Sequence, residues 1–155
     1  MLKQFWGKED SMYTAFDIAR FIIWYSKKKN YSISNLKLQK ILYFIQADYI
    51  ANKSKKCFSD IIEAWDLGPV VANIYDIYKI YGSAEIPIDG CEGIIKEIKL
   101  PDQIRIGEMV DKCSKYSASK LVSITHGQEP WKGAYKRYAN NEITPQSIRN
   151  YFSKV

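Results

Sequence analysis

The chain has 155 residues, of which 46% are hydrophobic and 26% are charged, with 23 basic side chains, 17 acidic side chains and one His. This length is typical of one domain with its own hydrophobic core, and the composition excludes a chain that is mainly disordered. The three Cys residues, at positions 57, 91 and 113, have no CxxC spacing, which excludes a disulfide scaffold and a zinc finger. They indicate a reducing, intracellular environment.

The longest uninterrupted apolar stretch is residues 21–25, far short of the ~20 residues that span a bilayer. The first residues contain no apolar segment of the kind found in signal peptides. We therefore expect a soluble, cytoplasmic protein with no membrane partner.

The formal charge of +6 and the pI of about 9.1 are compatible with a polyanionic partner. However, the lysines of residues 27–29 and 53–56 each follow a predicted helix, where cations complement the helix dipole. This placement favours solvated helix ends over a phosphate-binding track, because phosphate-binding sites gather their charges on one face. The 12 Tyr and four Trp residues exceed what a core of this size needs, and both side chains are favoured at interfaces.

The N-terminal half predicts two helices. Residues 1–12 show no periodicity and are interpreted as a mobile extension. Thr14 and Asp17 form a variant of the capping box at the start of a first helix, expected over residues 14–29. A second helix, expected over residues 35–52, is apolar nearly all round, which predicts that it lies in the middle of a bundle.

The middle of the chain predicts a strand, a helix and an irregular segment. Residues 61–65 are short, β-favouring and bounded by turn residues, which indicates a strand. A third helix, over about residues 70–81, is expected to begin with Pro69 in its first turn. Residues 83–100 predict a loop with one or two short strands that pair with residues 61–65. The third helix carries an Ile stripe, expected to face the core, and an adjoining Tyr stripe: Ile74, Ile77 and Ile80, and Tyr75, Tyr78 and Tyr81.

Four more helices are expected toward the C-terminus: residues 101–116, a helix capped by Ser117, residues 130–138, and a short helix opened by Thr144. The fold class is therefore mainly α, a compact bundle of about six to seven helices with a small β-hairpin or short β-sheet. No repeat or low-complexity linker divides the chain, so residues 13–155 are expected to form a single domain.

Groups for catalysis are scarce. The chain has neither a GxGxxG nor a GxxxxGK[ST] motif for nucleotide chemistry. His126 could pair with Cys113 for nucleophilic catalysis, but Cys113 lies on an apolar helix face, where Cys is usually an inert small hydrophobe. One His and three distant Cys also give no pair at metal-ligand spacing. We therefore expect no enzyme activity, no cofactor and no metal site.

His126 is better explained as part of a corner between two helices. It falls at the end of the fifth helix, before Gly127, where an imidazole can bond the last helical carbonyls. Glu129 and Pro130 then begin a new helix, and Trp131 is expected to pack back near the joint. This structural interpretation is favoured over a catalytic one.

Three segments resemble the motifs of one protein family. Residues 36–44 read Leu-Lys-Leu-Gln-Lys-Ile-Leu-Tyr-Phe, and residues 62–71 read Ile-Glu-Ala-Trp-Asp-Leu-Gly-Pro-Val-Val. Residues 121–131 contain Leu-Val-Ser-Ile-Thr-His and, after a short spacer, Pro-Trp. They are similar to the KLQKLLY, EAWxxGPV and LTHxxxPW signatures of the SocA-like antitoxin domain, also called the Panacea domain. The motifs occur in the right order, and the resemblance spans about residues 13–152.

The resemblance implies a mostly helical fold with a small β element and a role as the antidote in bacterial and prophage toxin–antitoxin pairs. The implied partner is a protein toxin encoded nearby, neutralised by direct complex formation. Toxins of the family include small alarmone synthetases and membrane-active peptides, and one branch delivers its toxin to an ATP-dependent protease as an adaptor. Leu67 departs from the family, which commonly has an aromatic or other large residue there. We expect this protein to lack the N-terminal DNA-binding domain of some members, which puts autoregulation by operator binding in doubt.

The family motif residues are implied to have structural or partner-binding roles. They are Lys37, Leu38, Gln39, Lys40, Tyr43, Glu63, Ala64, Trp65, Gly68, Pro69, Val70, Tyr75, Thr125, His126, Pro130 and Trp131. Among them, Trp65, Gly68 and Pro69 are expected to shape a turn rather than to touch a toxin.

Five residues are candidates for toxin contact: Tyr75, Tyr78, Tyr81, Lys37 and Lys40. If the Ile stripe of the third helix faces the core, the Tyr stripe lies about 100° round the helix, at the flank of the core or partly exposed. Lys37 and Lys40 lie away from the apolar face of the second helix, where they would be solvated or meet an acidic patch.

Two hypotheses from different classes follow. The leading one is a non-enzymatic antitoxin that binds a protein toxin through a standard-size interface of roughly 1,600 Å². The alternative is a nucleic-acid-binding regulator encoded by a phage or mobile element, which would bind more weakly as salt increases. An enzyme of unfamiliar type would depend on His126.

Overall fold

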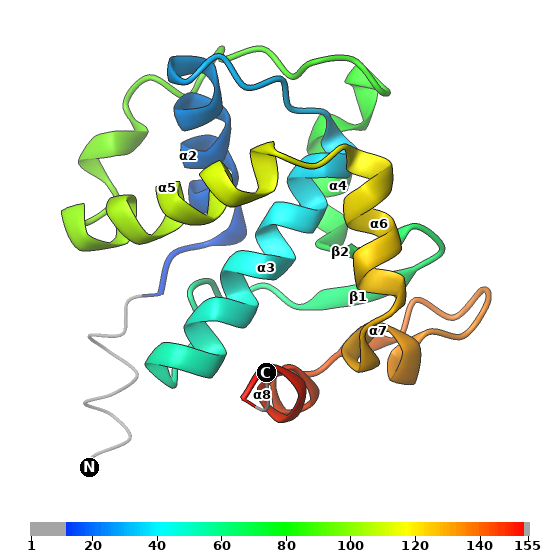
Figure 1. The fold of residues 1–155 in the computed structure, drawn as a ribbon. Helices are drawn as coiled ribbons and strands as arrows, with labels where there is room; N and C mark the ends of the chain where they lie inside the picture. The colour runs from blue at the N-terminus through cyan, green and yellow to red at the C-terminus, as the bar shows by residue number, and fades with distance from the viewer. Residues whose placement is uncertain (1–11, 154–155) are drawn as a thin grey trace.

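The computed structural model describes residues 12–153 (Figure 1), so the predicted extension at residues 1–12 lies almost wholly outside the described residues. The helices are α2 (Ala15–Lys28), α3 (Asn35–Lys53), α4 (Ala72–Tyr78), α5 (Leu100–Ser114), α6 (Ala118–His126), α7 (Glu129–Ala134) and α8 (Pro145–Phe152). Two short 3-10 helices are η1 (Lys79–Tyr81) and η2 (Ile94–Lys96). The strands are β1 (Ile62–Trp65), β2 (Gly68–Val70) and β3 (Glu142–Ile143). The predicted fold class, mainly α with a small β-sheet, is confirmed.

Side-chain caps set the starts of the first two helices. The Thr14 hydroxyl accepts the Asp17 amide at 3.1 Å and the Asp17 carboxylate accepts the Thr14 amide at 3.1 Å, which is the expected capping box of α2. Ser34 caps α3 by accepting the Lys37 amide at 3.3 Å. No helix within residues 12–153 is both long enough and apolar enough to cross a membrane.

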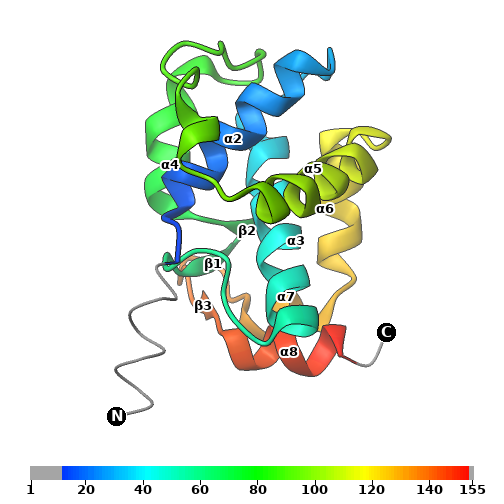
Figure 2. The ribbon, with the colours of Figure 1, turned by 90° about the vertical axis from the view of Figure 1, so that its left-hand side faces the viewer.

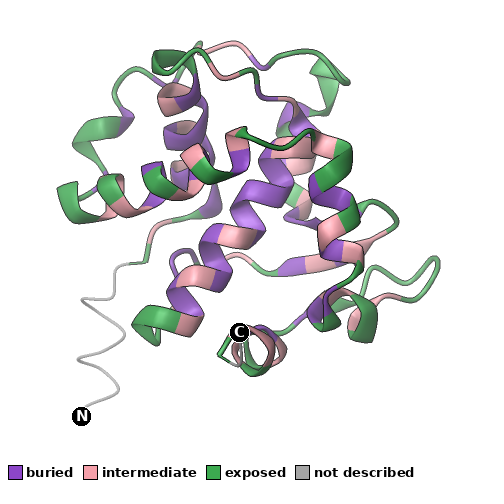
Figure 3. Cartoon of the chain, in the orientation of Figure 1, coloured by how far each residue is buried: buried purple, intermediate pink, exposed green. Residues whose placement is uncertain are grey.

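Helix α3 occupies the middle of the bundle, as predicted. It contacts α2, α4, α5, α6, α8 and β2, which surround it in two perpendicular views (Figures 1 and 2). Twelve of its 19 residues are buried, and in Figure 3 the helix is mainly purple, with pink bands and an exposed last turn. A helix that is buried on all sides cannot separate an apolar face from a polar one, which explains its apolar residues all round.

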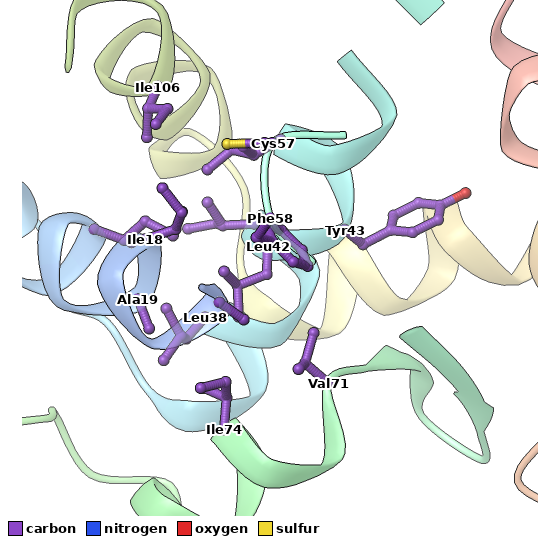
Figure 4. Close-up of a cluster of buried hydrophobic side chains, with 14 of the residues drawn as sticks. Ile18, Ala19, Leu38, Leu42, Tyr43, Cys57, Phe58, Val71, Ile74 and Ile106 are labelled. Atoms are coloured by element: carbon purple, nitrogen blue, oxygen red, sulfur yellow. The ribbon is translucent and has the colours of Figure 1, made fainter. Parts of the chain in front are cut away.

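The core gathers side chains from every part of the chain. Figure 4 shows Leu38 and Leu42 of α3 against Ile18 of α2, with Phe58 and Ile106 closing the cluster. All five side chains are buried. Burying apolar side chains of this size stabilises the fold by roughly 1.5–3 kcal/mol each, so the packing around α3 dominates stability.

The sheet differs from the sequence prediction. Strand β1 forms as expected, but it lies between β2 and β3, with Ala64 opposite Pro69 and Ile62 opposite Ile143. The prediction that residues 83–100 supply its partner strands is wrong, because that segment forms turns and η2. The expectation that Pro69 begins a helix is also wrong. Pro69 lies in β2, a sheet-edge strand, where the missing proline N–H removes no ladder bond.

Two helices end earlier than predicted. The third helix, expected over residues 70–81, begins at Ala72, because residues 68–70 belong to the sheet. Its α-helical part ends at Tyr78, where η1 follows. The helix expected over residues 130–138 ends at Ala134, and Tyr135 is extended with φ −67° and ψ 129°. The Asn141 side chain donates to the Ala134 carbonyl at 3.0 Å, so the following loop closes this helix end.

A buried amide on α3 holds the segment before β1. The Gln46 side-chain oxygen accepts the Cys57 amide at 2.7 Å and the Phe58 amide at 3.2 Å. Its side-chain nitrogen donates to the Phe58 carbonyl at 2.8 Å. One amide side chain therefore satisfies three buried backbone groups that belong to no regular strand.

We expect Gln46→Met to lower the free energy of unfolding by about 2–4 kcal/mol, because it leaves buried backbone donors and an acceptor without partners. Gln146→Met is the matched control, since Gln146 is an exposed helical amide that bonds only the Asn150 side chain at 2.8 Å. The control should change stability by less than about 0.5 kcal/mol. Equal effects in urea denaturation would contradict this role of Gln46.

Candidate functional site

The three sequence motifs converge on the turn between β1 and β2. Residues 36–44 lie in α3, residues 62–71 form β1, the turn and β2, and residues 121–131 form α6 and the start of α7. Contacts join α3 to β2, α6 to β2 and α7 to β1. Figure 1 shows β1 and β2 between α3 and the α6–α7 corner, so segments far apart in sequence build one region.

The outer edge of β2 is satisfied by amide side chains of α3. The Gln39 side-chain oxygen accepts the Val71 amide at 2.9 Å, and its nitrogen donates to the Asn35 side chain at 3.0 Å. The Asn35 nitrogen in turn donates to the Tyr75 carbonyl at 3.2 Å. This chain of bonds fixes α3 relative to β2 and the start of α4.

Lys40 holds the same edge. Its side chain is 0% exposed, and its Nζ donates to the Pro69 carbonyl at 2.8 Å. No carboxylate lies within ion-pair distance of this ammonium in residues 12–153. Burial therefore lowers the pKa of Lys40 to about 7.

Gly68 is required where the turn passes between α3 and α6. Its φ is +105°, a conformation that other residues rarely adopt. A Cβ atom there would lie 2.7 Å from Lys40 Cε and 2.8 Å from Thr125 Oγ1. The Thr125 hydroxyl is held by donating to the Val122 carbonyl at 2.8 Å, so it cannot move away freely.

Three stacked rings support the other side of the turn. The Trp131 ring stacks on His126 at a centroid distance of 4.1 Å and on Tyr135 at 4.5 Å. His126 Nε2 lies 2.9 Å from the Asp66 carbonyl, and the Tyr135 hydroxyl donates to the Asp66 carboxylate at 2.5 Å, which raises the pKa of Tyr135. The Trp131 indole donates to the Trp65 carbonyl at 2.8 Å. Each ring therefore fixes one polar group of the turn.

Two further motif side chains are held by hydrogen bonds. The Tyr43 hydroxyl donates to the Gln128 side chain at 2.7 Å, and in Figure 4 it points away from the rest of the apolar cluster. The Trp65 indole donates to the Glu63 carboxylate at 2.8 Å. Burial raises the pKa of Tyr43, so the hydroxyl stays a donor at neutral pH.

A groove of about 620 Å³ lies beside the turn, between α3, α4 and the loop of residues 135–141. We call it the turn groove and define it by residues on all its sides: Asn35, Trp65, Leu67, Tyr75, Lys79 and Tyr138. Leu67 at the tip of the turn is 55% exposed, and Tyr138 on the loop is 89% exposed. The groove therefore presents apolar and aromatic surface to the outside.

Comparison with models of protein families matches residues 38–132 to the family described as Antitoxin SocA-like, Panacea domain. This match covers more than half of the chain. The chain belongs to the Panacea family. Antitoxin SocA of Caulobacter vibrioides (strain NA1000 / CB15N) is 30% identical over 109 residues, which are 64% of this chain and 58% of that protein. The chain thus matches less than two thirds of that relative's length, and no solved structure matches.

The Panacea motif residues are mostly structural in their contacts. On the side of the central helix, Gln39 and Lys40 bond the outer edge of β2, and Thr125 lies against Gly68. On the side of the α6–α7 corner, the side chains of His126 and Trp131 contact the Asp66 and Trp65 carbonyls. The predicted helix corner is confirmed, since α6 ends at His126 and α7 begins at Glu129. The prediction that His126 bonds the last carbonyls of its own helix is wrong. Its Nε2 instead lies within hydrogen-bond distance of the Asp66 carbonyl.

The candidate toxin contacts are distributed differently from the prediction. Lys40 was expected on an exposed side of its helix, which is wrong because it is fully buried. Tyr78 is also buried, whereas Tyr75 is half-buried in the turn groove and Tyr81 is exposed. Lys37 is half-buried, and burial lowers its pKa. Contact of any of these residues with a toxin remains a prediction.

The Ile stripe of the third helix does not face the core as a whole. Ile74 is buried, but Ile77 and Ile80 are exposed, and Tyr78 is buried in their place. The reason is that the buried face of α4 follows the i,i+4 pair Ile74 and Tyr78 rather than the i,i+3 row of Ile residues. Ile80 lies beyond α4, in η1, which has no buried residue.

Sequence reasoning missed several residues of this region. Asn35, Gln128, Tyr135 and Tyr138 were not singled out, although the first three bond motif residues or the turn. A signal existed for Asn35, since a polar residue on a helix that is apolar all round must bond inside the fold. Tyr135 and Tyr138 had no signal, because both stood in or at the end of an expected helix.

The cysteines show no sign of reactivity in this structure. Cys57, Cys91 and Cys113 are free and buried, and burial raises their pKa, to about 11 for Cys91 and Cys113. Across residues 12–153, no three His, Cys, Asp or Glu side chains are grouped to hold a metal ion.

We expect Gly68→Ala to lower the free energy of unfolding by about 3 kcal/mol or more, because it adds backbone strain and a clash with Lys40 and Thr125. Gly82→Ala separates the two effects, since Gly82 has φ +58° but nothing within 4 Å of a new Cβ. That control should lose only about 1–2 kcal/mol. Similar losses for both variants in thermal unfolding would show that the close approach to Lys40 is unimportant.

Stability should rise with pH because of Lys40. Its folded pKa is lowered, so the unfolded chain binds more protons than the folded chain above pH about 7, up to the usual lysine pKa. The difference in unfolding free energy between wild type and Lys40→Met should therefore grow by about 1 kcal/mol per pH unit from roughly pH 7.5 to 9. Lys53→Met, at the exposed end of α3, is the control and should leave the slope unchanged. A slope in Lys40→Met equal to that of wild type would refute a neutral, buried Lys40.

Proposed function

We propose that this protein is an antitoxin that neutralises a cognate protein toxin by binding it directly, without catalysis. The observation that carries the proposal is membership of the SocA-like family, together with the likeness to a protein named Antitoxin SocA. Binding of this kind depends on surface complementarity and needs no reactive group. The toxin is proposed to be encoded nearby, and both proteins to meet in the cytoplasm.

The exposed aromatic and aliphatic residues support a binding role. Leu67 and Tyr138 are large apolar side chains in solvent, at the rim of a groove whose wall contains Trp65 and Tyr75. Aromatic side chains and rigid apolar anchors dominate the energetics of protein interfaces. A standard-size interface of roughly 1,600 Å² would cover the groove and its rim.

Two other modes of action have some support. Delivery of the toxin to an ATP-dependent protease remains compatible with the family, and it would remove the toxin rather than block it. The charge of +6 favours a nucleic-acid-binding regulator as a second candidate function. Binding to nucleic acid would weaken steeply as salt increases, whereas binding to an apolar protein surface would not.

The direct test is co-expression with the product of the adjacent reading frame, scored for growth and then for co-purification. We expect growth rescue and a stable complex for wild type, and the same for His126→Gln, whose side-chain amide can still bond the Asp66 carbonyl. Gly68→Ala is the poorly folding control and should rescue weakly.

Absence of rescue would contradict the antitoxin proposal. Rescue without a complex, accompanied by a shortened lifetime of the toxin, would replace blocking by binding with proteolytic delivery. Loss of rescue in His126→Gln, with folding intact, would contradict the absence of catalysis.

A further inference from the structure

The tip of the β1–β2 turn is an exposed leucine on a rigid support. Leu67 is 55% exposed, yet the residue before it is held by His126 and Tyr135 and the Trp65 carbonyl is held by Trp131. On its other side, Gly68 is wedged between helices α3 and α6. Immobilising a loop on binding normally opposes association, so a tip that is already fixed binds a partner more strongly.

Tyr138, in the loop of residues 135–141, adds an exposed aromatic ring to the turn groove. Tyr138 is 89% exposed and has φ +68°, and Asn140, two residues on, has φ +50°. Such backbone costs about 1–2 kcal/mol for a residue other than glycine, and strain of this kind is concentrated at functional sites. The Arg137 guanidinium lies 5.0 Å from the centre of the Tyr138 ring, which places a cation beside the aromatic surface.

The residues that line the groove also include two more aromatic side chains and a lysine. Trp65 and Tyr75 meet edge to face at 5.0 Å, which gives the groove a firm aromatic wall. Lys79 lines the rim and pairs with Asp76 at 3.4 Å, with both side chains more than half exposed. Such exposed pairs are weak, so the Lys79 ammonium is free to bind a carboxylate of a partner.

Two other hollows of comparable or smaller volume lack this combination. The cavity of about 650 Å³ between α7 and α8 is lined by the carboxylates of Glu129 and Glu142. The apolar face with Leu100 and Ile104 encloses about 310 Å³ and is lined by Glu108 without a cation. Of these three hollows, only the turn groove has a lysine among its lining residues, and the chain as a whole is positive at +6. Asp66 also lines the turn groove, and its carboxylate already accepts the Tyr135 hydroxyl.

We propose that the turn groove receives an apolar side chain of the cognate toxin that is flanked by a carboxylate. Leu67 and Tyr138, which both line the groove, pack against the apolar side chain, and Lys79 pairs with the carboxylate. This inference rests on the proposed antitoxin function and adds to it the binding surface and the chemistry of the toxin segment. A volume of about 620 Å³ lies within the usual range of pockets that enclose a compact group.

The test measures affinity and growth rescue for matched variants with the toxin from the co-expression experiment. Leu67→Glu and Tyr138→Ala should each raise the Kd by about 30-fold or more, as expected for central anchors. Ile104→Glu is the control for Leu67→Glu, because Ile104 is 57% exposed on α5, away from the turn groove. It should change the Kd by less than about twofold.

The charge is tested by a second matched pair. Lys79→Glu should raise the Kd by about tenfold, with a larger effect at low salt, because it places a carboxylate against the toxin's own. Lys132→Glu is the control, because Lys132 forms an ion pair of the same i,i+3 type. The distance is 3.3 Å between Lys132 and Glu129, and 3.4 Å between Lys79 and Asp76. Thermal unfolding of all variants confirms that the exposed substitutions leave the fold intact.

The outcomes separate the two proposals. Failure of wild type to rescue growth would overturn the antitoxin function itself. Rescue and tight binding by wild type, with groove variants indistinguishable from their controls, would overturn the turn groove as the docking surface and leave the function standing. Loss of affinity in Leu67→Glu and Tyr138→Ala without an effect of Lys79→Glu would refute the flanking carboxylate.

Discussion

The arrangement of the molecule depends on two backbone groups at the outer edge of β2. The sheet ends there, so no strand bonds the Pro69 carbonyl or the following Val71 amide. The side chains of Lys40 and Gln39 bond them instead, from the central helix. Each group would destabilise the fold by about 1–3 kcal/mol if it were buried without a partner. This constraint explains why a helix packed on all sides carries a lysine and an amide at adjacent positions.

The position of the turn follows from that edge. Once β2 is fixed against α3, the turn before it must pass between Lys40 and Thr125, where only glycine fits. The chain then presents the Asp66 and Trp65 carbonyls to the α6–α7 corner, where His126 and Trp131 meet them. Three segments that are distant in sequence are thereby fixed relative to one another by hydrogen bonds to backbone. Because the turn and β2 contribute backbone carbonyls to these bonds, only the helices must supply particular side chains.

The sequence was sufficient for elements with local signals and insufficient for those set by tertiary contacts. Helices α2 and α3 were predicted to within one residue at each end, and α6 and α8 at their starts, because local caps mark these starts: Thr14, Ser34, Ser117 and Thr144. Strand β2 was missed, because Pro69 suits the start of a helix equally well. Only the pairing of β2 with β1 determines that this segment is a strand. Lys40 was misplaced because a lysine is normally solvated. Its burial depends on the Pro69 carbonyl, 29 positions away in sequence.

The residues that hold the turn and the residues that face solvent around it are different ones. Most of the side chains that hold the turn belong to the motifs, with Tyr135 an exception, whereas Leu67 occupies an unspecified position within its motif and Tyr138 lies beyond the last. Substituting exposed side chains usually changes stability by less than about 0.5 kcal/mol, while it alters the shape and polarity of a groove directly. A fold built in this way can change its partner at the rim without disturbing the bonds that position the turn. In the proposed mode of binding, the exposed rim therefore selects the partner, while the buried bonds keep the turn in place.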